Sequence, residues 1–225
     1  MKKKNTKILS AALGALAAFA LWTVLLRFVD VQPIGPDGSR VGFASINGAF
    51  HALTGVHWTF YTLTDWLGLV PIGIAFGFAV LGLVQLLRRK SLLKVDRDIL
   101  LLGGFYLVVL AAYVLFETVV INYRPVLIGG KLEASYPSST TVLALCILPT
   151  AMMQLQTRIR REAVRRAVLG ILAAFTVFMV AGRLISGVHW LSDITGGVLL
   201  SAGLVMLYAF AIKRETAGDD PLCTV

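Results

Sequence analysis

The chain has 225 residues, of which 57% are hydrophobic and only 15% are charged, and its mean hydropathy is +0.81. About a quarter of the residues of a soluble globular domain are charged, so this composition excludes an ordinary soluble domain. The formal net charge of +9 is also found in nucleic-acid-binding proteins, and the positions of the basic residues decide between the two classes.

Six segments carry almost no charge and are long enough to cross a hydrocarbon layer of about 30 Å at about 1.5 Å per residue. We expect membrane-spanning helices at residues 8–29, 67–87, 99–121, 138–155, 167–185 and 193–212. The predicted fold class is therefore all-α, a polytopic membrane helical bundle of six transmembrane helices in a single domain over residues 1–225.

The basic residues gather on one side of these spans. Sixteen of the 21 fall in the predicted inner segments: Lys2, Lys3, Lys4, Lys7, Arg88, Arg89, Lys90, Lys94, Arg97, Arg158, Arg160, Arg161, Arg165, Arg166, Lys213 and Arg214. Only Arg27, Arg40, Arg124, Lys131 and Arg183 remain outside or at outer helix ends. Because basic residues concentrate on the cytoplasmic side, we expect a multi-pass protein of the cell membrane with both termini in the cytoplasm and no nucleic-acid partner.

The first span and the two cysteines raise two further questions, whether the first helix is cleaved and whether a disulfide forms. The Lys-rich start could open a secretory signal, but no small-residue cleavage site follows the apolar run, which favours an uncleaved first helix. Cys146 lies within the fourth span and Cys223 in the inner tail, so we expect no disulfide.

Residues 30–66 form the one long outer connection. It begins with turn-rich sequence and ends with the aromatic residues Phe50, Trp58, Phe60, Tyr61 and Trp66. Aromatic side chains favour the headgroup layer, and we predict an interfacial helix over residues 46–64. Within it, Thr-Gly-Val-His57-Trp echoes Ser-Gly-Val-His189-Trp further on, but five residues are too few to establish a repeat.

Polar residues gather at the outer ends of spans three to six: Arg124, Lys131, Glu133, Ser138, Ser139, Thr140, Arg183, His189 and Asp193. Ionisable groups this close to the hydrocarbon are candidates for function, although each alone is also compatible with an interfacial polar residue. Basic residues on the disfavoured side indicate an anionic ligand, and guanidinium groups bind phosphate oxygens in bidentate fashion.

His189 and Asp193 are four residues apart. On a helix they would share one face, with Asp193 accepting the Nδ1 proton and Nε2 left free as a base or nucleophile. Ser138 and Ser139 begin the fourth span, where backbone amides offer an anion site at a helix amino terminus. The alternative is that these serines only cap the helix.

Three elements together resemble the signature of the type 2 phosphatidic acid phosphatase (PAP2) superfamily. They are Tyr123-Arg124-Pro125, then Tyr136-Pro137-Ser138-Ser139-Thr140, then Gly182-Arg183 followed by His189 and Asp193. The resemblance covers about residues 67–212. It implies lipid-phosphate hydrolysis through a phosphohistidine, in which His189 attacks phosphorus, Asp193 orients it, and Arg124 and Arg183 bind the phosphoryl oxygens. No metal and no other cofactor is expected.

The chain departs from the family pattern at three positions. Glu117 stands in place of a lysine, Thr140 in place of the general-acid histidine, and Gly182 in place of a serine. We expect Glu117 to pair with Arg124 or Lys131, or to be protonated by burial. Lys131 either takes over the role of the lost cation or remains a solvated loop lysine.

Without its acid, catalysis should be weakened or altered, and Glu117, His57 and His51 are the candidates to replace it. Two functions stay open. One is a phosphatase that hydrolyses a lipid phosphate or an isoprenyl diphosphate, and the other is a protein that binds or translocates a lipid phosphate without turnover. The retention of His189 and Asp193 favours the enzyme. The partners expected are the lipid substrate and the bilayer, and no protein partner can be inferred.

Overall fold

A computed structural model describes residues 2–218 of the chain and the side chains of residues 5–213. The helices are α1 (Lys2–Phe28), α2 (Ala44–Thr54), α3 (Trp58–Leu67), α4 (Leu69–Arg89), α5 (Arg97–Thr118), α6 (Ser139–Arg158), α7 (Glu162–Ile185) and α8 (Leu191–Gly218). Two 3-10 turns, η1 (Pro36–Gly38) and η2 (Leu92–Lys94), lie in connections. Strand pairing within these described residues is limited to isolated bridges.

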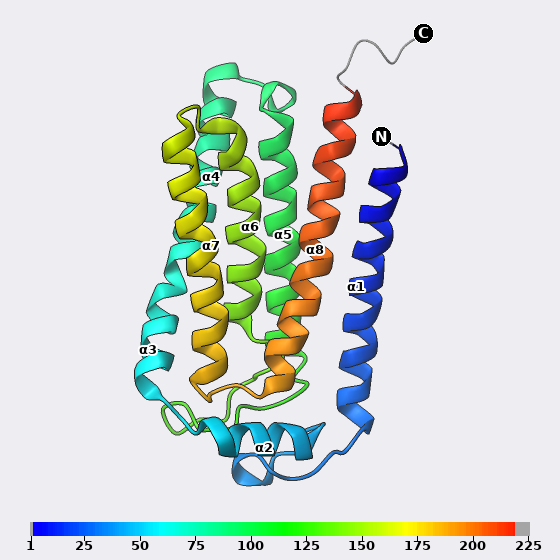
Figure 1. Ribbon diagram of the computed structural model, residues 1–225, viewed down its shortest axis with the longest axis vertical. Helices are drawn as coiled ribbons and strands as arrows, with labels where there is room; N and C mark the ends of the chain where they lie inside the picture. The colour runs from blue at the N-terminus through cyan, green and yellow to red at the C-terminus, as the bar shows by residue number, and fades with distance from the viewer. Residues whose placement is uncertain (1, 219–225) are drawn as a thin grey trace.

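Six helical segments of the described chain are long and apolar enough to cross a membrane. They are α1 from Asn5, α3 together with α4, α5, α6, α7, and α8 as far as Lys213. Figure 1 shows these segments running along the long axis, with α2 lying across one end. The predicted fold class is confirmed, and the protein is a multi-pass membrane protein.

The predicted interfacial helix over residues 46–64 needs a correction. The chain breaks at Gly55, whose φ of +67° ends α2, and a new helix begins at Trp58. That helix, α3, continues through Gly68 into α4 as one apolar segment, Trp58–Arg89. Only α2 lies across the end of the bundle, because the positive φ at Gly55 turns the chain from that direction into the second span (Figure 1).

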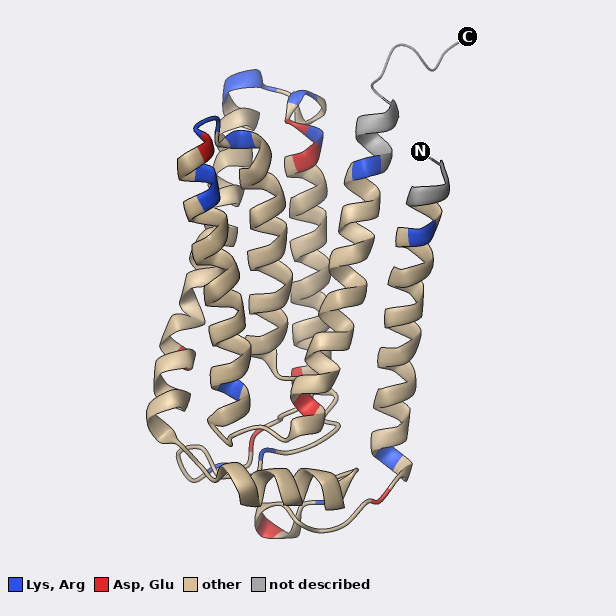
Figure 2. Ribbon diagram, in the orientation of Figure 1, with Lys and Arg blue, Asp and Glu red and all other residues tan. Residues whose placement is uncertain are grey.

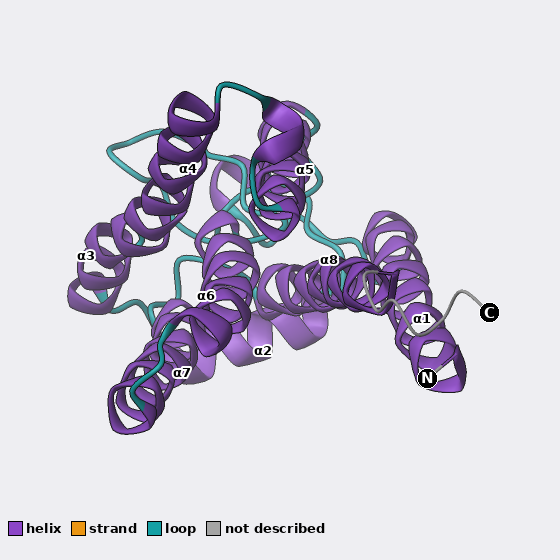
Figure 3. Cartoon of the chain, turned by 90° about the horizontal axis from the view of Figure 1, so that it is seen from above, coloured by secondary structure: helices purple, strands orange, loops and turns teal. Residues whose placement is uncertain are grey.

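Helix α6 is the most buried of the six spans and packs on α4, α5, α7 and α8. Seen along the bundle in Figure 3, α1 lies beside α8 and away from α4 and α7. Gly203 of α8 allows that contact, since a Cβ there would lie 2.6 Å from Leu16 Cγ of α1. Small residues commonly permit such close helix contacts in membranes.

The two ends of the bundle differ in charge. The loops between α4 and α5 and between α6 and α7 lie at the same end as the start of α1 and the end of α8 (Figure 1). Lys and Arg gather at this end in Figure 2. The opposite end holds α2, the start of α6 and the junction of α7 with α8, and there the predicted site residues meet.

Candidate active site

The connection between α5 and α6 folds back on itself as a short irregular hairpin. Tyr123 pairs with Ala134, and Gly129 and Gly130, both with positive φ, form the turn. Side chains alternate between the two faces of paired strands. The neighbours of Tyr123 and Ala134 therefore share the face opposite to theirs, and these neighbours are Asn122, Arg124, Glu133 and Ser135. Their backbones also pair, with the Arg124 amide donating to Glu133 O (3.1 Å) and the Ser135 amide to Asn122 O (2.9 Å).

This shared face points into the protein. Asn122, Arg124 and Ser135 are buried on it, whereas Tyr123 and Ala134 on the other face are only partly covered. Neither Ser135 nor Asn122 was among the predicted site residues, although the alternation around the Gly129-Gly130 turn is a signal in the sequence that points to both.

Asp193 sits in the first turn of α8 and is completely buried. Its Oδ2 accepts hydrogen bonds from the Trp190 amide (3.0 Å) and the Ser135 hydroxyl (2.5 Å), and its Oδ1 accepts one from Asn122 Nδ2 (3.2 Å). The bond from Trp190 caps the start of α8, as an acidic residue in the first turn often does.

The expected direct bond between Asp193 and His189 is not what the structure shows. Asp193 Oδ2 lies 4.0 Å from His189 Nδ1, and the Ser135 hydroxyl lies between them, 3.0 Å from that same Nδ1. The reason is that α8 begins at Leu191, so His189 precedes the helix and does not share its face with Asp193. Ser135 therefore joins the two predicted partners.

The other imidazole nitrogen faces both arginines. His189 Nε2 lies 3.3 Å from Arg124 Nη1 and 3.3 Å from Arg183 Nη2. Guanidinium groups only donate, so Nε2 is the acceptor and carries no proton. The pKa of His189 lies well below its ordinary value of 6.5, because the ring is buried and the two guanidinium charges oppose its protonation.

Each arginine also has a carboxylate neighbour at the edge of the site. Arg124 Nε lies 3.2 Å from Glu133 Oε2, and Arg183 Nη1 lies 3.6 Å from Asp65 Oδ1. Neither contact has hydrogen-bond geometry, and Arg183 Nε likewise has no hydrogen-bond partner among the described groups. Buried guanidinium N–H groups left in this state favour an anion with several oxygens.

Helix α3 holds Arg183 in place. The Arg183 guanidinium lies over the Tyr61 ring, 5.1 Å from its centre, besides its contact with Asp65. Next to Arg183, a Cβ on Gly182 would approach Thr64 Cγ2 to 2.7 Å. The glycine that replaces the family serine therefore makes room for α3.

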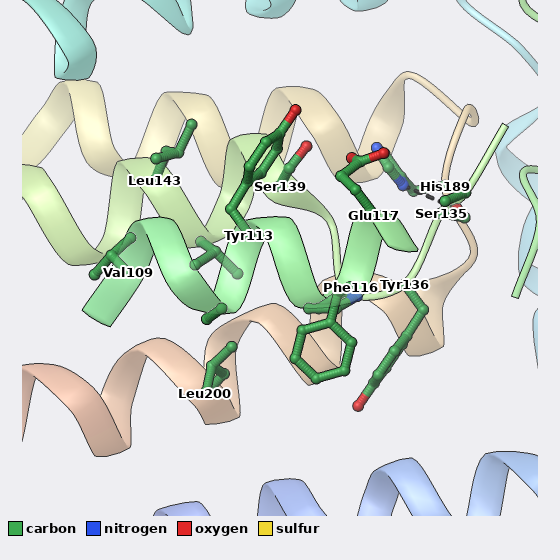
Figure 4. A pocket seen from close by; sticks show the side chains of 14 residues that line it. Val109, Tyr113, Phe116, Glu117, Ser135, Tyr136, Ser139, Leu143, His189 and Leu200 are labelled. Atoms are coloured by element: carbon green, nitrogen blue, oxygen red, sulfur yellow. Dashed lines mark hydrogen bonds between the residues drawn. The ribbon is translucent and has the colours of Figure 1, made fainter. Parts of the chain in front are cut away.

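His189, Ser135 and Glu117 line one small cavity of about 20 Å³, together with residues of α5 and α6. In Figure 4, His189 and Ser135 lie at one end of this pocket, and Val109 and Leu143 at the other. Val109, Leu143, Tyr113 and Ser139 also line a second, apolar groove of about 960 Å³. This groove is lined mainly by α4 and α5, with Ser139, Leu143 and Ile147 of α6, and it extends as far as Val95.

The residues that replace family positions lie around the site in different ways. Glu117 lines the small cavity but is exposed, and it pairs with neither Arg124 nor Lys131 among the described side chains, since Glu133 is the neighbour of Arg124. Lys131 is exposed at the hairpin turn, where its backbone pairs with Ile128, and it is not brought to His189. Thr140 Cγ2 approaches the α3–α4 junction, 3.6 Å from where a Cβ on Gly68 would lie.

Ser138 and Ser139 have different surroundings. The Ser138 amide donates to Asp193 O at 3.2 Å, and its hydroxyl accepts a bond from Thr141 Oγ1 at 3.1 Å. Ser138 thus fastens α6 to α8, and its amide is not available to an anion. Ser139 lines both the small cavity and the groove.

The two other histidines lie outside the small cavity. His51 of α2 packs against Trp190 with ring centres 5.5 Å apart, and His57 Nε2 bonds to Thr54 O at 2.8 Å. The His57 amide donates to Ser186 O at 2.9 Å, so the two segments that echo each other in sequence lie in contact. Gly187 makes this contact possible, since a Cβ there would lie 1.9 Å from Gly55 O.

Within the described part of the chain, no group of three or more His, Cys, Asp or Glu side chains could hold a metal ion. Cys146 is buried in α6, and Cys223 lies outside the described residues. What the site offers is a neutral imidazole facing two guanidinium groups at one end of a membrane bundle. The chemistry of this combination, at the end of a membrane helical bundle, suits an anion with several oxygens.

The family model described as the PAP2 superfamily matches residues 72–216. The chain belongs to this superfamily. It is also similar in fold to the crystal structure of the first transmembrane PAP2 type phosphatidylglycerolphosphate phosphatase from Bacillus subtilis, with a TM-score of 0.50 and 18% sequence identity, over 92% of this chain and 96% of that one. None of the curated proteins compared matches the chain.

Proposed function

We propose that the protein is a phosphatase of lipid phosphates or isoprenyl diphosphates that works through a phosphohistidine on His189. The observation that carries the proposal is the position of His189 Nε2, 3.3 Å from a guanidinium nitrogen of each arginine. A phosphoryl group placed there would have its oxygens on Arg124 and Arg183 and its phosphorus in front of the lone pair. Charge developing on those oxygens would be stabilised by donors already in position.

The apolar groove supports a lipid substrate. It shares Tyr113, Ser139, Val109 and Leu143 with the small cavity beside His189, and it runs along α4 and α5. A hydrocarbon chain lying in the groove would place its phosphate end near Ser139 and Glu117. The burial of apolar surface would then supply the binding energy, and the arginines would orient the phosphate.

The missing histidine at Thr140 bears on the choice of substrate. An alkoxide leaving group gains roughly 10²- to 10⁴-fold from protonation in the transition state, whereas a phosphate leaving group can depart unprotonated. We therefore propose that an isoprenyl diphosphate is a better substrate than a lipid monophosphate such as phosphatidate.

We also propose that the site faces the outer side of the cell membrane and that both termini are cytoplasmic. The support is the concentration of Lys and Arg at the end of the bundle opposite His189 (Figure 2), together with the tendency of basic residues to stay inside.

The test is phosphate release by the purified protein in detergent from a panel of lipid monophosphates and diphosphates, with a His189→Ala variant as control. We expect release by the wild type, none by the variant, and an acid-labile phosphoenzyme in the wild type only. Binding of the lipids without release by the wild type would contradict the proposal. It would support the second candidate, a binding or translocating protein, which the replacements at Glu117 and Thr140 favour.

A further inference from the structure

Ser135 lies outside every motif that pointed to this site, yet it touches both residues of the nucleophilic pair. Its oxygen is 3.0 Å from His189 Nδ1 and 2.5 Å from Asp193 Oδ2, while those two atoms are 4.0 Å apart. All three side chains are buried, with exposed fractions of 3% for Ser135, 3% for His189 and 0% for Asp193.

The directions of the bonds follow from the chemistry of the groups. Asp193 as a carboxylate can only accept, so the single hydroxyl proton of Ser135 is donated to Asp193 Oδ2. The Ser135 oxygen is then left to accept, and its partner at 3.0 Å must be a protonated Nδ1. This agrees with Nε2, which faces two guanidinium donors and must be unprotonated.

We propose that Ser135 is a positioning residue that orients the Nδ1-protonated imidazole of His189 by linking it to Asp193. The proposal rests on the function proposed above. In this arrangement the Ser135 hydroxyl, and not the Asp193 carboxylate, makes the direct contact with His189 Nδ1.

During attack, the Nε2 lone pair forms the bond to phosphorus while the bond from phosphorus to the leaving oxygen breaks, and that oxygen departs with the bonding electrons. The imidazole then carries one positive charge and keeps its proton on Nδ1. Ser135 accepts the hydrogen bond of that proton and donates its own to Asp193, so the negative carboxylate stabilises the charged ring through the hydroxyl.

The hairpin geometry explains why Ser135 can hold this position. Its amide donates to Asn122 O at 2.9 Å, and Asn122 Nδ2 donates to Asp193 Oδ1 at 3.2 Å. Both hairpin arms are thus fastened to the same carboxylate, and the serine oxygen has little freedom to leave the line between His189 and Asp193.

The experiment compares Ser135→Ala, Ser135→Thr and the wild type. We expect Ser135→Ala to lower kcat by about 10- to 100-fold, as for a small misplacement of a reacting group, with KM within about threefold because both arginines remain. Ser135→Thr keeps the hydroxyl and should recover most of the lost kcat. Ser201→Ala is the matched control, since it removes a buried serine hydroxyl from α8 two turns beyond Asp193 and should leave kcat unchanged.

The second measurement is independent of turnover. ¹H–¹⁵N NMR of histidine-labelled protein should show the Nδ1 proton of His189 hydrogen-bonded and slow to exchange with water in the wild type and in Ser201→Ala. In Ser135→Ala the arginines still face Nε2, so the proton should stay on Nδ1, but its resonance should shift upfield and exchange faster because its hydrogen-bond acceptor is gone. An unchanged kcat or an unchanged Nδ1 proton resonance in Ser135→Ala would overturn the proposal. If the wild type releases no phosphate from any lipid, the proposed function fails, and the NMR comparison alone decides the role of Ser135.

Discussion

Gly182 of α7 lies directly against Thr64 of α3, so closely that a Cβ on the glycine would come within 2.7 Å of Thr64 Cγ2. The next residue, Arg183, carries one of the two guanidinium groups of the site and contacts α3 through Tyr61 and Asp65. The absence of a side chain at one position of α7 thus determines how near α3 approaches the arginine.

The first prediction concerns the restoration of the family serine. Gly182→Ser should lower the free energy of unfolding by about 1–3 kcal/mol, because the new side chain overpacks the contact with Thr64. It should also lower kcat/KM by displacing Arg183. Thermal unfolding in detergent and lipid-phosphate hydrolysis are the measurements.

Two further variants locate the cause of that effect. Thr64→Ser removes the colliding methyl and keeps the hydroxyl, which bonds to Phe60 O at 2.7 Å, so the double variant Thr64→Ser/Gly182→Ser should regain stability. Gly170→Ser is the control on α7, because nothing lies within 4 Å of its Cβ position. Equal stability of Gly182→Ser and Gly170→Ser would contradict the predicted collision.

The second prediction concerns the arginines. Arg183→Lys should reduce kcat/KM by roughly 10²- to 10³-fold, because lysine keeps the charge but cannot donate two parallel hydrogen bonds to the phosphoryl oxygens from one planar group. Arg124→Lys should act in the same direction. Arg40→Lys, an exposed arginine outside the site, should stay within about twofold of the wild type. Equal activity of all three variants would refute phosphate binding by the arginines.

The third prediction is a dependence of stability on pH. Because the pKa of folded His189 lies well below 6.5, the unfolded chain binds a proton at this residue below about pH 6.5 while the folded chain does not. Stability should therefore fall as the pH drops below that value, by at most about 1.4 kcal/mol per pH unit from this residue.

His189→Gln removes this effect. Unfolding midpoints of the two proteins should run in parallel above about pH 7 and move apart below about pH 6, with the wild type losing more stability. The pKa of His51 is also lowered by burial, but His51 is present in both proteins and its contribution cancels. A wild type that gains stability relative to the variant on acidification would be inconsistent with a neutral buried imidazole.

The fourth prediction concerns sidedness. Ser138 and Ser192 lie at the same end of the bundle as His189, but both are buried, so cysteines there would not react from either side. Lys131 and Arg161 are exposed at opposite ends of the bundle. In a Cys223→Ser background, Lys131→Cys should react with an impermeant thiol reagent added outside intact cells, and Arg161→Cys only after lysis. The reverse pattern would place the site in the cytoplasm.

The fifth prediction concerns the leaving group. Thr140→His restores the family acid and should raise hydrolysis of a lipid monophosphate more than that of a lipid diphosphate, since only the former needs a protonated leaving group. The ratio of kcat/KM on the two substrates is the measurement, and Thr140→His in a His189→Ala background is the control for contamination. Equal gains on both substrates would mean that another residue supplies the proton.

The membrane spans could be predicted from the sequence because hydrophobic length and basic residues act locally along the chain. The second span was the exception. Its first part, α3, carries the aromatic residues Trp58, Phe60 and Trp66, which local composition assigns to the interface. Its actual direction depends on the turn at Gly55 and on the contact between Thr64 and Gly182, which lie far apart in sequence.

The predicted catalytic residues on α7, α8 and the hairpin do converge, since the spacing of Arg124, Arg183, His189 and Asp193 reflects contacts at one bundle end. The roles of their neighbours could not be predicted in the same way. The alternation of side chains along the hairpin could have placed Ser135 on the face of Arg124, but its contacts with His189 and Asp193 are tertiary. For Asp65, the sequence offers no periodicity that connects α3 to Arg183. Lys131 is close to Arg124 in sequence, which made it a candidate to replace the lost cation. It lies exposed at the hairpin turn and does not contact His189.

The segments Gly55–Trp58 and Gly187–Trp190 are in contact, and this contact links the loop that carries His189 to a helix that faces the bilayer. Gly187 in the loop before His189 rests on Gly55, and α3 begins three residues later with aromatic side chains exposed on its surface. A helix adapts its tilt to the thickness of the hydrocarbon around it, and the loop that carries His189 follows the start of α3. For the phosphatase proposed above, we therefore expect the turnover rate to vary with the acyl-chain length of the host lipid, even when that lipid is neither substrate nor inhibitor.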